Sequence, residues 1–155
     1  MPIKKKGKAE NAISMLKSDH EKVKELFDKF EKATNSAAKE KIVAEALMEL
    51  KIHATVEEEF FYPALEGTSS TRAWELVSTT EEGYRTVEQL LKGMSPQDRN
   101  FDEKMTQLID AVNHHVEREE EEILDEARKT LSEYRLEELG LEMEDRRRLL
   151  TQLTA

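Results

Sequence analysis

The chain has 155 residues and a formal net charge of −10, with five glycines, three prolines and no cysteine. This length fits a single domain with its own core, and the absence of cysteine excludes disulfides and thiolate metal ligands. The acidic balance argues against binding to nucleic acid, which requires a concentrated positive face.

The composition predicts an all-α protein, because Glu, Lys, Leu and Ala dominate and apolar residues recur at steps of three and four. Residues 1–9 contain the basic run KKKGK, which we interpret as a solvated, flexible N-terminus. The sequence has no apolar run of membrane-spanning length and no apolar stretch typical of a signal peptide. We therefore expect a cytoplasmic protein that does not associate with membranes.

The first two predicted helices cover about residues 10–33 and 37–62. His20 lies in the middle of the apolar face of the first helix, since it follows the three- and four-residue steps of that face. After TNSAAKE, where Asn35 or Ser36 is a candidate N-cap, the second helix carries its own apolar stripe. Its stripe includes His53 and Glu57, and Pro63 followed by EGTSS is predicted to end the helix.

The third and fourth predicted helices cover about residues 71–92 and 101–131. The third contains no histidine, and its buried face includes Tyr84 together with Thr80 or Glu81. The fourth repeats the spacing of the second, because His115 and Glu119 both lie on its apolar stripe. The neighbouring His114 is turned about 100° away from that stripe.

Four long helices with short connections predict an antiparallel up-down-up-down four-helix bundle over residues 10–133. A short C-terminal extra helix is expected within a helical tail, residues 134–155, after a stop at Gly140. This extra helix either packs on the bundle or serves association, as in a homodimer. Counted from the turns, four inward residues fall at similar depth in the bundle: His20, His53, Tyr84 and His115.

Polar residues on the inward stripes indicate a metal site. A carboxylate inside a bundle is protonated, paired with a cation or bound to metal, and no Lys or Arg shares the stripes of Glu57 and Glu119. A histidine and a glutamate four residues apart lie one turn apart on one face, so two helices each offer a nitrogen and an oxygen. Histidine and carboxylate ligands without sulfur favour iron or manganese over structural zinc.

Each of these residues also has a structural interpretation. A single inward histidine is most often a hydrogen-bonded core residue, and EREEEEILDE by itself would be a solvated acidic face. The metal interpretation is favoured because three of the four histidines converge at one depth, two of them with a glutamate one turn further on.

Three motifs, DHEKVKELF, HATVEEEFFYP and HHVEREEEEIL, together resemble the hemerythrin-like, or HHE cation-binding, family over most of residues 10–131. The stretch LGLEMEDRR also looks like the tail that often follows bacterial members. The resemblance implies two iron ions, bridged by carboxylates and by oxo or hydroxo, with an open position for a small molecule. Manganese has overlapping ligand preferences. The implied ligands are His20, His53, Glu57, His115 and Glu119.

The third helix departs from the family pattern, since members usually present a histidine where this chain has TTEEGYRTVEQLL. Setting GYRTVEQLL against DHEKVKELF places Tyr84 opposite His20, with Glu81 one turn earlier. Tyr84 is the preferred ligand and Glu81 the second candidate, while the alternative for Tyr84 is a core aromatic whose hydroxyl finds a partner. A phenolate ligand favours ferric iron, so we expect a role other than simple oxygen carriage.

The sequence leaves three functions open. In the first, the centre turns over dioxygen, hydrogen peroxide or nitric oxide, with the metals as Lewis acids. In the second, it senses such molecules or handles iron without turnover. In the third, the chain is a metal-free helical bundle that associates with a partner through its tail.

Overall fold

The structure is a computed structural model that describes residues 11–95 and 97–154, and the predicted basic N-terminus lies outside these residues. Helices account for nearly all of the described residues, and no strand occurs among them, so the predicted all-α class is confirmed. The elements are α1 (Ala12–Lys32), α2 (Ser36–Val56), η1 (Glu57–Phe61), α3 (Tyr62–Glu66), α4 (Thr71–Lys92), α5 (Phe101–Arg118), η2 (Glu119–Ile123), α6 (Leu124–Thr130) and α7 (Glu133–Thr154).

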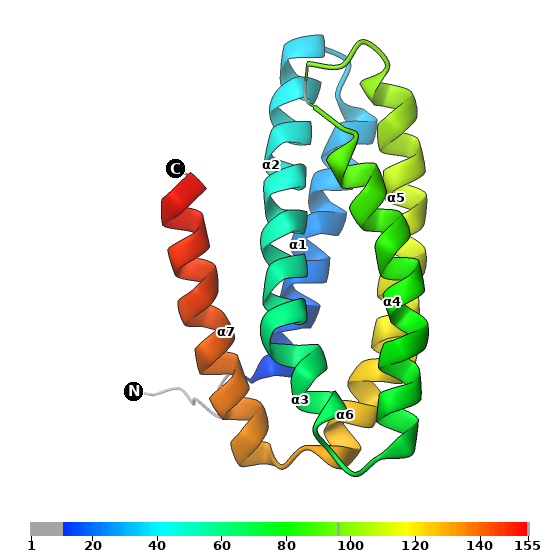
Figure 1. Cartoon of the computed structure of the whole chain (residues 1–155). Helices are drawn as coiled ribbons and strands as arrows, with labels where there is room; N and C mark the ends of the chain where they lie inside the picture. The colour runs from blue at the N-terminus through cyan, green and yellow to red at the C-terminus, as the bar shows by residue number, and fades with distance from the viewer. Residues whose placement is uncertain (1–10, 96, 155) are drawn as a thin grey trace.

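Figure 1 shows four helical rods side by side, with the chain reversing direction from each rod to the next. The first rod is α1, the second is α2 continued by η1 and α3, the third is α4, and the fourth is α5 continued by η2 and α6. The rods pack most extensively as two pairs, α1 with α2 and α4 with α5. Within the described residues, no helix has the length and apolar character needed to cross a bilayer.

Side-chain caps fix where the helices begin. Asn11 and Ser14 form a reciprocal capping box at the start of α1. At the start of α2, the backbone N–H of Ala38 donates to Asn35 Oδ1 at 3.0 Å, so Asn35 rather than Ser36 is the cap. Ser70 caps α4 in the same way.

Two apolar clusters fill the interior, and a polar layer separates them. Along α1, one cluster takes the buried apolar residues up to Leu16 and the other takes those from Val23 onward. Asp19 and His20 lie between the two clusters. The same interruption occurs at one level on the other three rods. It contains His53 and Glu57 on the second rod, Thr80 and Tyr84 on the third, and His115 and Glu119 on the fourth. The matching depth predicted from the sequence is therefore present.

The second helical rod ends within the predicted EGTSS segment, but the prediction that Pro63 ends it is wrong. The chain passes through the π-helical turn η1 and continues as α3 to Glu66 before Gly67. Pro63 lies in the first turn of α3, where a missing N–H costs little because the preceding turn is irregular.

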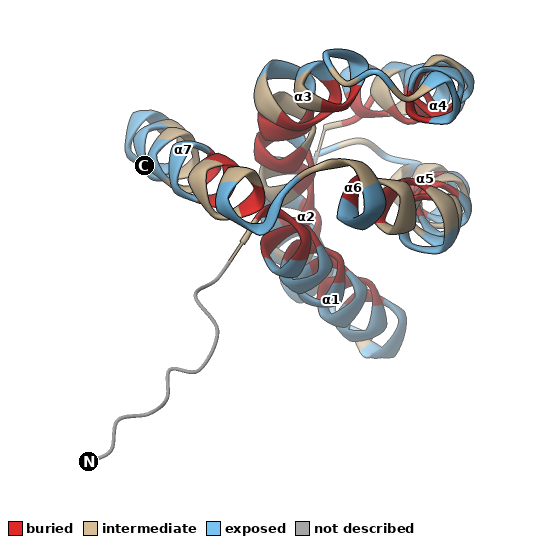
Figure 2. Ribbon diagram, turned by 90° about the horizontal axis from the view of Figure 1, so that it is seen from below, coloured by how far each residue is buried: buried red, intermediate tan, exposed pale blue. Residues whose placement is uncertain are grey.

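The prediction that Gly140 stops a helix is also wrong, because α7 runs without a break through this residue. A Cβ at Gly140 would lie 3.0 Å from the backbone carbon of Asn11 and 3.1 Å from the nitrogen of Ala12. The glycine therefore permits close contact between α7 and the beginning of α1. Figure 2 shows α7 outside the four rods with its buried face turned toward them.

Candidate metal centre

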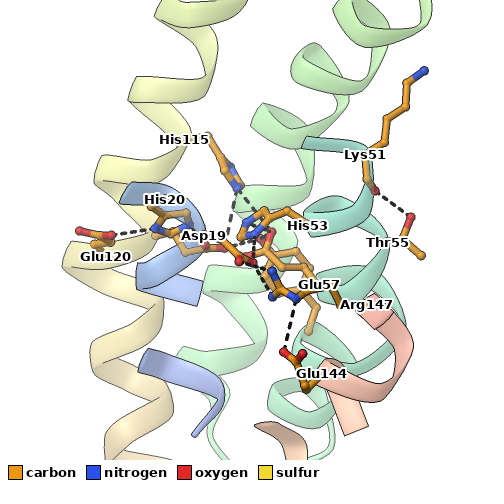
Figure 3. A network of polar contacts seen from close by, with 12 residues as sticks. Asp19, His20, Lys51, His53, Thr55, Glu57, His115, Glu120, Glu144 and Arg147 are labelled. Atoms are coloured by element: carbon orange, nitrogen blue, oxygen red, sulfur yellow. Dashed lines mark hydrogen bonds and ion pairs between the residues drawn. The ribbon is translucent and has the colours of Figure 1, made fainter. Parts of the chain in front are cut away.

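The polar layer brings the five metal ligands implied by the resemblance into one buried group. His20, His53, Glu57 and Glu119 each offer one ligand atom, and these atoms all lie within 4.8 Å of one another. Both glutamate side chains are fully buried. His115 points into the same group from α5 (Figure 3), with its Nε2 3.9 Å from Glu57 Oε1 and 3.7 Å from Glu119 Oε2.

The inward atoms of this group lack hydrogen-bond partners. Among the described residues, the unpartnered buried atoms include the Nε2 atoms of all three histidines, Glu57 Oε2 and Glu119 Oε1. His20 Nε2 lies 3.0 Å from Glu119 Oε1, and His53 Nε2 lies 3.3 Å from Glu57 Oε1, in both cases without hydrogen-bond geometry. Buried polar atoms that face a common point without partners fit coordination to metal ions.

The outward nitrogens of two histidines are held by carboxylates. His53 Nδ1 lies 2.8 Å from Asp19 Oδ2, and His20 Nδ1 lies 2.7 Å from Glu120 Oε2. A carboxylate that accepts the Nδ1 proton leaves the Nε2 lone pair facing inward, which is the usual arrangement around metal-binding histidines. Neither Asp19 nor Glu120 was singled out from the sequence, although Asp19 follows Met15 and Leu16 at helical spacing.

The tail helix reaches this centre through Arg147. Its guanidinium bonds both carboxylate oxygens of Asp19, with Nη2 donating to Oδ2 at 2.8 Å. Burial alone would raise the pKa of Asp19, but His53 and Arg147 hold it below the usual value. The sequence indicated no chemistry in the tail, because 128 residues separate Arg147 from Asp19.

Tyr62 contacts both buried glutamates. Its hydroxyl donates to Glu119 Oε2 at 2.6 Å and lies 3.2 Å from Glu57 Oε1. Sequence periodicity did not place it there, since a residue five positions after Glu57 falls off the inward face of a regular α-helix.

Both histidine and glutamate pairs are followed by a π-helical turn that begins at the glutamate. The N–H of Tyr62 donates to the carbonyl of Glu57, and that of Leu124 to the carbonyl of Glu119, each five residues back. A π-turn inserts one extra residue into a helix and is frequent at functional sites. Here the insertion changes which residues face inward beyond each glutamate and brings Tyr62 to the centre.

Residues 11–127 match the hemerythrin family, described as the hemerythrin HHE cation binding domain. The chain belongs to this family. It is also similar to the crystal structure of a hemerythrin HHE cation binding domain-containing protein from Mycobacterium kansasii, with a TM-score of 0.78 and 25% identity over 91% of this chain and 87% of that one.

The chain is also similar to a DNA nickase from Nostoc sp. (strain PCC 7120). The two sequences are 30% identical over 135 residues, which is 85% of this chain. The chain spans only 38% of that protein's length. The activity in its name therefore belongs to a much longer protein.

The third rod of this HHE domain presents Tyr84 inward and Glu81 outward. Tyr84 is 6% exposed, and its ring centroid lies 5.9 Å from that of His115. Glu81 is exposed and does not join the buried group, because Thr80 takes the inward position. Burial and the surrounding carboxylates raise the pKa of Tyr84, so its phenolate form requires a nearby cation.

The buried histidines and glutamates of the centre shift one another's pKa values before any metal binds. Burial would raise the pKa of Glu57, but His53 holds it well below the usual value, while burial and the carboxylate of Glu57 raise the pKa of Glu119. The carboxylates of Glu57 and Asp19 outweigh burial and raise the pKa of His53. Divalent cations would replace these protons and offset the two buried carboxylates.

Proposed function

We propose that this HHE domain binds two iron ions, bridged by carboxylates and by oxo or hydroxo, and that the centre binds or reacts with dioxygen, hydrogen peroxide or nitric oxide. The observation that carries the proposal is the convergence of five unpartnered, buried ligand atoms, contributed by three of the four rods, at one level of the bundle. Manganese fits the same nitrogen and oxygen ligands. The proposed ligands are His20, His53, Glu57, His115 and Glu119, with Tyr84 as a sixth.

Different residues would bind the ions, support the ligands and orient the carboxylates of such a centre. The histidines bind through Nε2, and Asp19 and Glu120 fix the rings of His53 and His20 from behind. Glu57 and Glu119 enter from different rods and would each present an unpartnered oxygen to the ions, while Tyr62 orients Glu119. Iron, when bound, would supply Lewis acidity and electrons to a small molecule.

The chain itself favours a small molecule over nucleic acid. Its formal net charge of −10 opposes the approach of a phosphate backbone, so we propose no nucleic-acid partner for it. We also propose that simple oxygen carriage is not its main role, because an inward tyrosine on the third rod favours ferric iron.

Metal content tests the proposed site. Purified protein loaded with iron should contain about two ions per chain, because two bridging carboxylates match two cations. His115→Ala should lower this number, and His114→Ala, at an exposed position one residue away, should not. Less than about one ion per chain, with stability unaffected by chelator, would instead support the metal-free interaction bundle.

Reactivity separates turnover from binding. The iron-loaded protein should consume hydrogen peroxide over many cycles if the centre is catalytic, with His115→Ala inactive. A stable spectroscopic adduct with nitric oxide or dioxygen, without peroxide consumption, would favour sensing or iron handling.

A further inference from the structure

A cavity of about 550 Å3, lined largely by α1 and α5, reaches the metal centre. Its inner wall includes His20, His53, Glu57 and His115, each of which has a buried, unpartnered ligand atom. Further out, its walls include the apolar side chains of Val23 and Val112. The cavity therefore connects the ligand atoms with the surface along the gap between the two pairs of rods.

Carboxylates dominate the outer lining of this cavity. They follow one side of α1 and one side of α5 and η2, at steps of three and seven residues. Among the described residues, the outer lining has one ammonium group, that of Lys24. All six carboxylate residues are exposed, and only Glu120 has a partner in the described structure, His20. The acidic rim consists of Glu21, Asp28, Glu31, Asp110, Glu117 and Glu120.

The opposite side of the centre carries an arginine of α7 whose charge is compensated by carboxylates. Arg147 bonds Asp19, which in turn holds His53, and also pairs with Glu144, on the side away from Glu120 (Figure 3). A cleft lined with charge of one sign concentrates ions of the other sign and speeds their association. Dioxygen, hydrogen peroxide and nitric oxide carry no charge, so the acidic rim gives them no such advantage.

We propose that this cavity is the access route for hydrated divalent metal ions, Fe2+ or a chemically similar cation, to the metal centre. The acidic rim attracts the ion, and the inner histidines and Glu57 replace its water. This inference rests on the proposed metal site, but it concerns how fast the site fills rather than whether it fills.

The test measures the rate of Co2+ uptake by metal-free protein, followed by the visible absorption of the bound ion. One variant carries Asp28→Asn, Glu31→Gln, Asp110→Asn and Glu117→Gln, four rim residues that are not ligands. A control variant neutralises four exposed glutamates that do not line the cavity and have no ion-pair partner among the described residues: Glu40, Glu45, Glu75 and Glu103. Both variants change the formal net charge from −10 by the same amount.

We expect the rim variant to take up Co2+ about tenfold more slowly than wild type at low salt, and the control variant to stay within about twofold. Added salt should slow wild type and the control but hardly affect the rim variant. All three proteins should reach the same final number of ions per chain.

Equal uptake rates for the rim and control variants, with normal final loading, would overturn the access route and leave the metal site intact. Wild-type protein that binds no Co2+ or Fe2+ at equilibrium would overturn both. A rim variant with a lower final stoichiometry but an unchanged rate would make these carboxylates ligands and would also contradict the route.

Discussion

The two tyrosines of the metal centre differ in what surrounds their side chains. The hydroxyl of Tyr62 donates a hydrogen bond to Glu119, so this residue acts as a neutral phenol that orients a carboxylate. Tyr84 is buried beside His115, and its raised pKa means that it ionises only when a bound cation stabilises the phenolate or a strong base takes the proton. The two residues should therefore differ in the spectrum of the ferric protein.

Tyr84→Phe should abolish a visible phenolate-to-iron charge-transfer band of the ferric protein. Tyr62→Phe should retain the band, because its hydroxyl contacts carboxylates in the structure. The measurement is the absorption spectrum of matched, iron-loaded samples. A band that survives Tyr84→Phe would show that this tyrosine is a core aromatic and not a ligand.

At this scale the sequence predicts the residues that face inward and misses those that support them. His53 and Glu57 could be found because a four-residue step is visible in one helix. Tyr62 could not, since its position depends on a π-turn that α-helical periodicity does not reveal. The contact between Arg147 and Asp19 depends on tertiary packing over 128 residues.

The tail helix α7 is part of the metal centre's support. It packs against α1, α2 and η1, and its Arg147 is the cationic partner of Asp19. Since Asp19 fixes the ring of His53, α7 can influence the centre without touching a metal ion.

Arg147→Gln should weaken metal affinity by up to about 10-fold, the low end of the loss usual for the direct partner of a metal ligand, because Arg147 acts on His53 through Asp19. Arg148→Gln is the matched control, because Arg148 is exposed and pairs only with Glu144 and Asp145 among the described residues. Competition with a chelator measures the affinity, and the ferric-to-ferrous potential should shift in the same variant. An unchanged affinity and potential would make Arg147 a purely structural residue.

The close contact of α7 with α1 gives a prediction for two glycines. Gly140→Ala should lower the free energy of unfolding by about 1–3 kcal/mol, because the new methyl group meets the backbone of Asn11 and Ala12. Gly83→Ala, in α4, should raise the free energy of unfolding by about 0.5–1 kcal/mol. A Cβ there meets nothing within 4 Å, and alanine reduces the conformational freedom of the unfolded chain. Urea unfolding at fixed metal content measures both; a stabilised Gly140→Ala would contradict the contact.

Helix boundaries were predictable where a local signal decides them. Asn35 was one of two candidate caps, and the structure shows its side chain accepting from Ala38. Pro63 and Gly140 were misread because each has a second role that depends on its surroundings. Pro63 follows a π-turn, and Gly140 faces the backbone of another helix.

At the scale of the whole molecule, a polar layer lies between two apolar clusters. This layer contains two fully buried glutamates. Buried carboxylates with unpartnered oxygens destabilise a metal-free fold, and cations that bind only the folded chain stabilise it. Metal binding and folding are therefore linked in this account.

The most direct test is a crystal structure of iron-loaded protein with anomalous scattering measured at the iron edge. The account predicts two anomalous peaks among His20, His53, Glu57, His115 and Glu119, with each histidine bound through Nε2. Water or hydrocarbon at that level without an anomalous peak, or His53 and His115 turned toward solvent, would contradict it.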